Sequence, residues 1–251
     1  MKGKNIKKKL KDFSVNVDDI ILGDFDAIGE LTAKKARGPD SPMYKYGKYF
    51  RANYERGILM YYLVRQFKIT SFLEVGTGRG YVSFCVAKAM YDSNINGTII
   101  TIDPDIEKQG MEEILKYIPQ QWWSKIKFAK GVSQAVLPDI NENFELVYID
   151  GAHDKESVLH DWTWAKSHFT KFCIFDDYFM SDEKRETMDI KSVVDTINEY
   201  DKELIITDRR IFLDDRGLKD SDIDYGQVIV YKDKKLKRFV DSTGVDDWLQ
   251  A

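Results

Sequence analysis

The sequence predicts an α/β protein with a doubly wound, mostly parallel seven-stranded sheet that closes with an antiparallel hairpin at its C-terminal end. Short apolar segments alternate with helical segments from Ser71 onward, as in a parallel sheet covered by helices on both faces. The apolar segments lack polar alternation, which is typical of strands buried on both sides. Two strand-like segments near the end have no helix between them, which indicates the hairpin.

Each element follows from a local pattern. A helix is expected over 46–67, where Leu59 and Leu63 lie one turn apart. Further helices are expected over 81–91, 106–117, 156–169 and 182–200, with a short one after Ser133. The expected strands cover 71–75, 98–102, 125–129, 144–149, 172–175, 204–212 and 225–231, and a polar loop over 213–224 joins the last two.

Length and composition indicate one main domain with extensions. The 251 residues suit a single α/β domain, and 43% hydrophobic residues suffice for a sizeable core. We expect an N-terminal extension or lid over 1–45, the main domain over 46–233 and a C-terminal tail over 234–251. The formal net charge of −4 argues against a nucleic-acid partner.

The chain shows no sign of membrane insertion or export. Its apolar runs are too short to span a bilayer, and no apolar stretch follows the Lys-rich start. Cys85 and Cys173 lie in apolar segments and are expected to be buried, reduced thiols. These features favour the cytoplasm. Trp122, Trp123, Trp162 and Trp164 could form pocket walls or a homo-oligomer interface, but we expect core packing for most of them.

A glycine-rich loop gives the strongest functional signal. The segment FLEVGTGRG (residues 72–80) lies where a strand turns into a helix, and Gly76, Gly78 and Gly80 allow a tight turn and close approach of a ligand. A dinucleotide fingerprint would need a third glycine at position 81, which is Tyr81. A carboxylate at Glu74 suits a ligand amino group better than a pyrophosphate. The alternative is a glycine-rich turn without a ligand.

Asp103 ends the second predicted strand. An acidic residue at this point can accept hydrogen bonds from both hydroxyls of a ribose. NAD-binding proteins share this feature, so it does not separate the two kinds of cofactor. Asp103 could instead cap the helix that follows.

These residues resemble a known family. Glu74 to Gly80 resembles the first motif of class I S-adenosylmethionine (SAM)-dependent methyltransferases, Asp103 matches their ribose-binding acid, and the closing hairpin is similar to theirs. The resemblance covers roughly 50–232. It implies SAM as cofactor, bound by the loop that includes Thr77. Ser133 and Gln134, followed by Leu137-Pro138, resemble the adenine-side loop of catechol-type, metal-dependent O-methyltransferases.

Three carboxylates end neighbouring predicted strands. Asp150, Asp176 and Asp177 should therefore converge at one edge of the sheet, where unpaired carboxylates repel one another. A hard divalent cation would relieve this repulsion, and Mg²⁺ fits oxygen ligands best. The resemblance likewise implies metal ligands at these positions. The alternative is that one or two of them cap helices or bind loop amides.

The sequence departs from the catechol enzymes at two positions. Asp177 replaces their Asn ligand, and His153 stands where their general base is Lys. The pattern more closely resembles Mg-dependent macrolide-sugar O-methyltransferases, whose equivalent His is the proposed base. An ordinary pKa near neutrality suits His153 to this role, although it could be a plain loop residue. We do not expect a zinc cluster with His160 and His168, because His168 would point well away from His160 along a helix.

The sequence therefore predicts a SAM-dependent O-methyltransferase that acts on a hydroxyl of a small molecule. Mg²⁺ chelation would favour a vicinal diol such as a sugar or a catechol. The alternatives are an NAD(P)-linked oxidoreductase, a metal-independent methyltransferase, or a SAM-binding module without activity. Arg51 and Arg56 could meet an anionic substrate, but we expect them simply to belong to an amphipathic helix.

Overall fold

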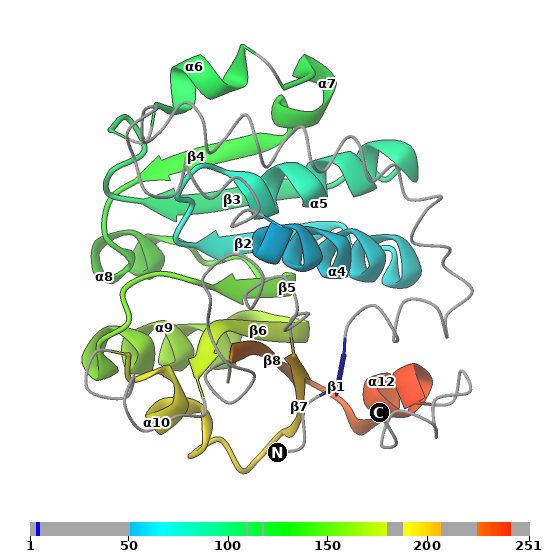
Figure 1. Ribbon diagram of the computed structural model, residues 1–251, viewed down its shortest axis with the longest axis vertical. Coiled ribbons are helices and arrows are strands. Elements are labelled where there is room, and N and C mark those ends of the chain that lie inside the picture. The colour runs from blue at the N-terminus through cyan, green and yellow to red at the C-terminus, as the bar shows by residue number, and fades with distance from the viewer. Residues whose placement is uncertain are drawn as a thin grey trace.

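A computed structural model of the chain describes residues 4–5, 51–108, 110–116, 118–179, 188–206 and 225–241. Its strands form one sheet in the order β1-β7-β8-β6-β5-β2-β3-β4 (Figure 1). The strands are β1 (Lys4–Asn5), β2 (Ser71–Val75), β3 (Thr98–Asp103), β4 (Ile126–Lys130), β5 (Phe144–Ile149), β6 (Phe169–Phe179), β7 (Asp201–Ile206) and β8 (Tyr225–Tyr231).

The pairing confirms the predicted sheet. Strands β4, β3, β2, β5 and β6 are parallel, whereas β8 is antiparallel to both β6 and β7. All seven strands expected from the sequence are present, although β7 covers Asp201–Ile206 and residues 207–212 of the expected strand lie outside the described residues. The two-residue β1 pairs with β7 and adds a short parallel strand at that edge.

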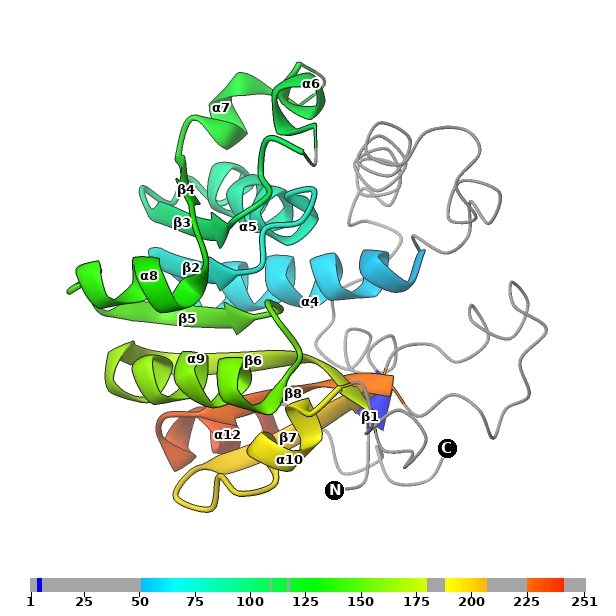
Figure 2. The ribbon, with the colours of Figure 1, turned by 90° about the vertical axis from the view of Figure 1, so that its left-hand side faces the viewer.

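Helices cover both faces of the sheet (Figures 1 and 2). The α4 and α5 side packs on alternate strand residues such as Phe72, Tyr148 and Phe172. The α9 and α10 side packs on their neighbours, such as Leu73 and Cys173. The helices are α4 (Arg51–Phe67), α5 (Tyr81–Asp92), α6 (Met111–Leu115), α7 (Gln120–Trp123), α8 (Ser133–Val136), α9 (Lys155–His168), α10 (Ile190–Val194) and α12 (Lys234–Asp241), with a 3₁₀ turn over Leu137–Asp139.

Several boundaries differ from the predictions for local reasons. The helix expected over 106–117 is limited to α6, because Gly110 has a φ of +74°, which a right-handed helix cannot contain. Strand β6 is longer than expected and continues through Asp176 and Asp177, with an irregularity between Phe175 and Tyr178. Of the helix expected over 182–200, the described residues contain only α10. Residues 180–187 lie outside the described residues.

Some expectations fall outside the described residues. The possible lid over 1–45, apart from Lys4–Asn5, and the loop over 213–224 are among them. Both cysteines are buried and free, as expected. In the described part of the chain, every helix is too short or too polar to cross a bilayer.

The sheet order determines where a ligand can bind. Strand β2 lies between β3 and β5, because the chain runs outward from β2 through β3 to β4 and then crosses back to β5 on the other side of β2. In open α/β sheets this reversal opens a crevice beyond the carboxyl ends of the strands. The loops after β2, β3 and β5 therefore line the expected site.

Candidate functional site

The glycine-rich loop makes a tight turn from β2 into α5. Gly76, Gly78 and Gly80 have φ values of +92°, +49° and +80°, a region that favours glycine. A Cβ on Gly76 would lie 1.9 Å from the Asp150 carbonyl oxygen, so this position also needs glycine for space. The amide of Asp150 donates to the Val75 carbonyl at 2.8 Å and completes the contact between the two loops.

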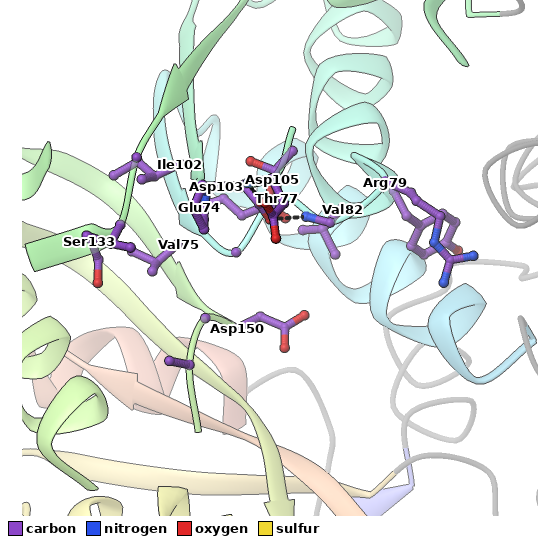
Figure 3. Close-up of a pocket in the computed structure, with 18 of the residues that line it drawn as sticks. Glu74, Val75, Thr77, Arg79, Val82, Ile102, Asp103, Asp105, Ser133 and Asp150 are labelled. Atoms are coloured by element: carbon purple, nitrogen blue, oxygen red, sulfur yellow. Dashed lines mark hydrogen bonds between the residues drawn. The ribbon is translucent and has the colours of Figure 1, made fainter. Parts of the chain in front are cut away.

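A cavity of about 480 Å³ opens beside this loop (Figure 3). This volume lies within the range typical of small-molecule sites. The sequence-predicted cofactor residues line it, except Gly80, which begins helix α5 behind the loop. The lining includes Glu74, Gly76, Thr77, Gly78, Asp103, Ser133, Gln134 and Asp150, and also Arg56.

Glu74 lies beneath the loop with only 2% of its surface exposed. Its Oε2 accepts hydrogen bonds from the hydroxyls of Ser83 and Thr101, both at 2.6 Å. Burial raises the pKa of Glu74 to about 7, although these two hydrogen bonds act to lower it. A positively charged group in the cavity would favour the ionised form of this carboxyl.

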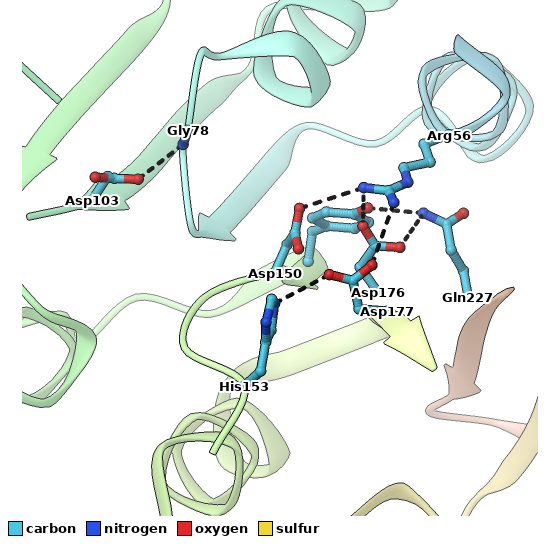
Figure 4. Close-up of polar contacts among 9 residues, drawn as sticks. Arg56, Gly78, Asp103, Asp150, His153, Asp176, Asp177 and Gln227 are labelled. Atoms are coloured by element: carbon cyan, nitrogen blue, oxygen red, sulfur yellow. Dashed lines mark hydrogen bonds and ion pairs between the residues drawn. The ribbon is translucent and has the colours of Figure 1, made fainter. Parts of the chain in front are cut away.

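Asp103 holds the loop from the neighbouring strand β3. Its Oδ2 accepts a hydrogen bond from the Gly78 amide at 2.9 Å (Figure 4). Its Oδ1 accepts a hydrogen bond from the Asp105 amide at 2.7 Å. The next helix, α6, begins only at Met111, so Asp103 does not cap it. The carboxylate therefore lines the cavity and fixes the position of the loop.

The far wall of the cavity comes from α8. Ser133 is buried at the start of this helix, and the Gln134 side-chain amide donates to the Ser157 hydroxyl on α9 at 3.1 Å. Asp161, which the sequence analysis did not single out, is buried below this wall. Burial raises its pKa, and a hydrogen bond from Ser133 acts in the opposite direction. Polar contacts thus fix α8 on α9.

The three predicted metal ligands come together, and Arg56 from α4 lies among them (Figure 4). The guanidinium forms an ion pair with Asp176, and its nitrogens lie 3.7 Å from Asp150 Oδ2 and 3.5 Å from Asp177 Oδ1. The Asp176 side chain is fully buried, and that of Arg56 is 14% exposed. We call Arg56, Asp150, Asp176 and Asp177 the charged cluster.

Residues from β5 and β8 complete the surroundings of Asp176. The Gln227 side-chain amide donates to Asp176 Oδ1 at 3.3 Å and to the Tyr148 hydroxyl at 2.8 Å. Burial raises the pKa of Asp176 to about 6, while Arg56 acts to lower it. Burial and the neighbouring carboxylates also raise the pKa of Asp150 well above its ordinary value.

His153 lies at the edge of the charged cluster. Its Nε2 is 3.1 Å from Asp177 Oδ2, and this hydrogen bond is the main cause of the raised pKa of His153. Asp177 has a φ of +50°, an uncommon conformation that aspartate tolerates. His160 pairs with Asp161 and His168 with the Trp164 carbonyl, so neither joins His153.

The family comparison identifies the central part of the chain. Residues 73–178 match a family model described as a methyltransferase domain. Residues 73–178 thus form a methyltransferase domain. This match confirms the enzyme class predicted from the sequence and speaks against an NAD(P)-linked oxidoreductase. No curated protein matches the chain in sequence.

Solved structures confirm the fold of the methyltransferase domain. A candidate O-methyltransferase from Klebsiella pneumoniae has a TM-score of 0.59 at 16% identity and covers 86% of this chain and 93% of its own. The O-methyltransferase TomG from Streptomyces achromogenes, in complex with SAM, has a TM-score of 0.54 at 15% identity, with coverages of 82% and 88%. PaMTH1 from Podospora anserina has a TM-score of 0.56 at 14% identity, with coverages of 83% and 88%.

Sequence reasoning missed two partners of the methyltransferase domain's acidic residues. Arg56 was expected simply to belong to an amphipathic helix, yet it contacts all three carboxylates. Gln227 lies among apolar neighbours in β8, and a polar residue in such a buried strand was the available signal. Nothing in the α4 pattern distinguishes Arg56 from other cationic residues, such as Arg65.

Glu74 provides a test of the loop's electrostatics. The pKa of Glu74 is about 7 in the folded protein and 4.5 ordinarily. Between pH 4.5 and pH 7 the folded state therefore holds a proton that the unfolded state has lost, and the free energy of unfolding falls as the pH rises through this range. Relative to Glu74→Gln, the wild type should lose about 3 kcal/mol of unfolding free energy between pH 4.5 and pH 7. Urea unfolding across this range measures it. A difference that does not change with pH would contradict the assignment.

Arg56 provides a test of the charged cluster. Arg56→Gln should lower the free energy of unfolding by about 3–5 kcal/mol, because buried carboxylates lose their cation. Arg65→Gln on the exposed surface of the same helix is the control and should cost no more than about 1 kcal/mol, because it loses only its contacts with Tyr61. Equal effects of the two substitutions in urea unfolding would show that Arg56 does not compensate the carboxylates.

Proposed function

We propose that this chain transfers the methyl group of SAM to a hydroxyl oxygen of a small molecule. The observation that carries the proposal is the cavity of the methyltransferase domain, where the glycine loop, Asp103 and Asp150 meet. TomG in complex with SAM and PaMTH1 bound to S-adenosylhomocysteine have the same fold and support the choice of cofactor.

The lining residues suit the separate parts of SAM. Asp103 retains lone pairs that can accept hydrogen bonds from the ribose hydroxyls. Glu74, at the bottom of the loop, favours the ammonium group of the methionine part, and Ser133 and Gln134 face the adenine. The bare backbone of Gly76, Thr77 and Gly78 lets the cofactor approach closely. SAM would then present its methyl group toward Asp150 and the charged cluster.

The reaction requires positioning and removal of one proton. A new bond forms between the acceptor oxygen and the methyl carbon, the bond from that carbon to sulfur breaks, and its electron pair leaves sulfur neutral. The hydroxyl proton passes to His153. The Asp177 carboxylate accepts a hydrogen bond from Nε2–H of this imidazole, which assigns the lone pair to Nδ1 as the basic atom.

The Mg²⁺ ion predicted from the sequence stays a prediction, and the arrangement of the charged cluster does not fit a site made of three aspartates. Both oxygens of Asp176 have protein partners, Arg56 and Gln227, and both oxygens of Asp177 have partners, Arg56 and His153. Among the residues that the structure describes, the set that could share an ion is Asp150, His153 and Asp177. In the proposed reaction the side chains of the chain itself position the acceptor and take its proton.

A small polyol, such as a sugar, remains the acceptor that we propose. One hydroxyl would give its proton to His153, and a neighbouring hydroxyl would donate a hydrogen bond to Asp150, which lines the cavity. Two such contacts orient a vicinal diol for attack on the methyl carbon, and orientation of this kind supplies much of the rate in enzymes.

Cofactor binding is the first test of the proposal. Isothermal titration calorimetry should show one SAM per chain and no heat with NAD. Gly76→Ala should weaken SAM binding at least tenfold, because the new Cβ would collide with the Asp150 carbonyl. Gly110→Ala is the control, because Gly110 also has a positive φ but has no neighbour within 4 Å of its Cβ position. Saturable binding of NAD in place of SAM would refute the proposed cofactor.

His153 is tested by turnover with radiolabelled SAM and a panel of sugars and catechols. His153→Ala should reduce kcat by about 10²-fold or more while SAM affinity stays unchanged, because the base acts only on the acceptor proton. His168→Ala, at the other end of α9, is the control and should retain full activity. Full turnover by His153→Ala would show that another group takes the proton.

A further inference from the structure

Arg56 occupies the position in which the sequence predicts a divalent metal. We infer that this arginine is the resident cation of the acceptor site, and that it makes methyl transfer by this chain independent of a divalent metal. The role of Arg56 in methyl transfer rests on the proposed function, whereas the presence of its guanidinium among the three carboxylates does not.

The first argument is contact. The guanidinium reaches all three carboxylates at once, through an ion pair with Asp176 and distances of 3.7 Å to Asp150 and 3.5 Å to Asp177. A single metal ion bound by all three aspartates would have to displace Arg56 or Gln227 from Asp176, because both oxygens of this carboxylate have protein partners and Mg²⁺ binds carboxylates at about 2.1 Å. The ion and the guanidinium would also repel each other at this short range.

The second argument is burial. Arg56 and Asp176 form their ion pair with side-chain exposures of 14% and 0%. The Gln227 amide and the Tyr148 hydroxyl enclose Asp176 from the other side. A guanidinium suits a buried carboxylate because it combines a positive charge with donors in a fixed geometry, and removing it would leave the buried charge uncompensated.

The third argument is access to the reacting groups. Arg56 lines the same cavity as Gly76 and Asp150, so its charge faces the space assigned to the acceptor and the methyl group. Because Asp177 contacts both Arg56 and His153, the arginine also fixes the carboxylate that orients the proposed base. In this position Arg56 can favour negative charge that develops on the acceptor oxygen.

Binding of Mn²⁺, followed by electron paramagnetic resonance, tests the inference without any methyl transfer. The wild type should bind Mn²⁺ only at millimolar concentration. Arg56→Gln should bind one Mn²⁺ at least tenfold more tightly, because the carboxylates lose their cation, and Arg56→Gln/Asp176→Asn should lose this gain. Arg56→Lys keeps the positive charge and should bind Mn²⁺ as weakly as the wild type; this comparison tests the inference if Arg56→Gln does not fold. The control Arg65→Gln should also bind Mn²⁺ as weakly as the wild type.

A thermal shift gives a second readout. Mn²⁺ should raise the melting temperature of Arg56→Gln and leave that of the wild type unchanged. Transfer by the wild type should be equal in EDTA and in Mg²⁺. Micromolar binding of one Mn²⁺ by the wild type, or dependence of its turnover on Mg²⁺, would overturn the inference. Failure to bind SAM would refute the proposed function and leave the result of the Mn²⁺ titration to decide the occupation of the cluster.

Discussion

The close approach of Gly76 to the carbonyl of Asp150 is the constraint on which the rest of the site depends. Strand β2 pairs with β3 on one side and with β5 on the other, so the loops after these strands meet at one edge of the sheet. A side chain at position 76 would force the loops apart. Their contact places the cofactor cavity directly beside the acidic strand ends.

Charge compensation is the second requirement of this edge. Parallel strands bring Asp150, Asp176 and Asp177 together without regard to their mutual repulsion. Arg56 offsets part of this repulsion; it lies on helix α4, which packs on one face of the sheet. The hydrogen bonds of Gln227 and Tyr148 then fix one arrangement of the buried charges, because an unpaired polar group in this environment is costly.

The two halves of the site differ in how far the sequence could predict them. The glycine loop, Asp103 and the three aspartates directly follow or end predicted strands, and the topology of a parallel sheet brings such residues to one edge. The observed sheet order places all of them there. The roles of the individual residues stay predictions, as do the limits of the lid and of the tail.

The remaining features depend on contacts that no local pattern contains. Arg56 and Asp177 are 121 positions apart, and Gln227 and Asp176 are 51 apart, so their pairing appears only when helix and strand layers are packed. The hydrophobic pattern likewise cannot show that Gly110 adopts a positive φ and shortens the expected helix to α6. The hydrophobic pattern of the sequence thus predicts the elements of the fold, but it does not predict which buried polar side chains pair with one another.

A crystal structure of the chain grown with S-adenosylhomocysteine tests the central claim most directly. The account predicts the nucleoside in the cavity beside Gly76, with its ribose hydroxyls on Asp103, its adenine against Ser133, and the guanidinium of Arg56 still paired with Asp176. A cavity that stays empty at saturating ligand, or a nucleoside bound elsewhere on the chain, would contradict the account.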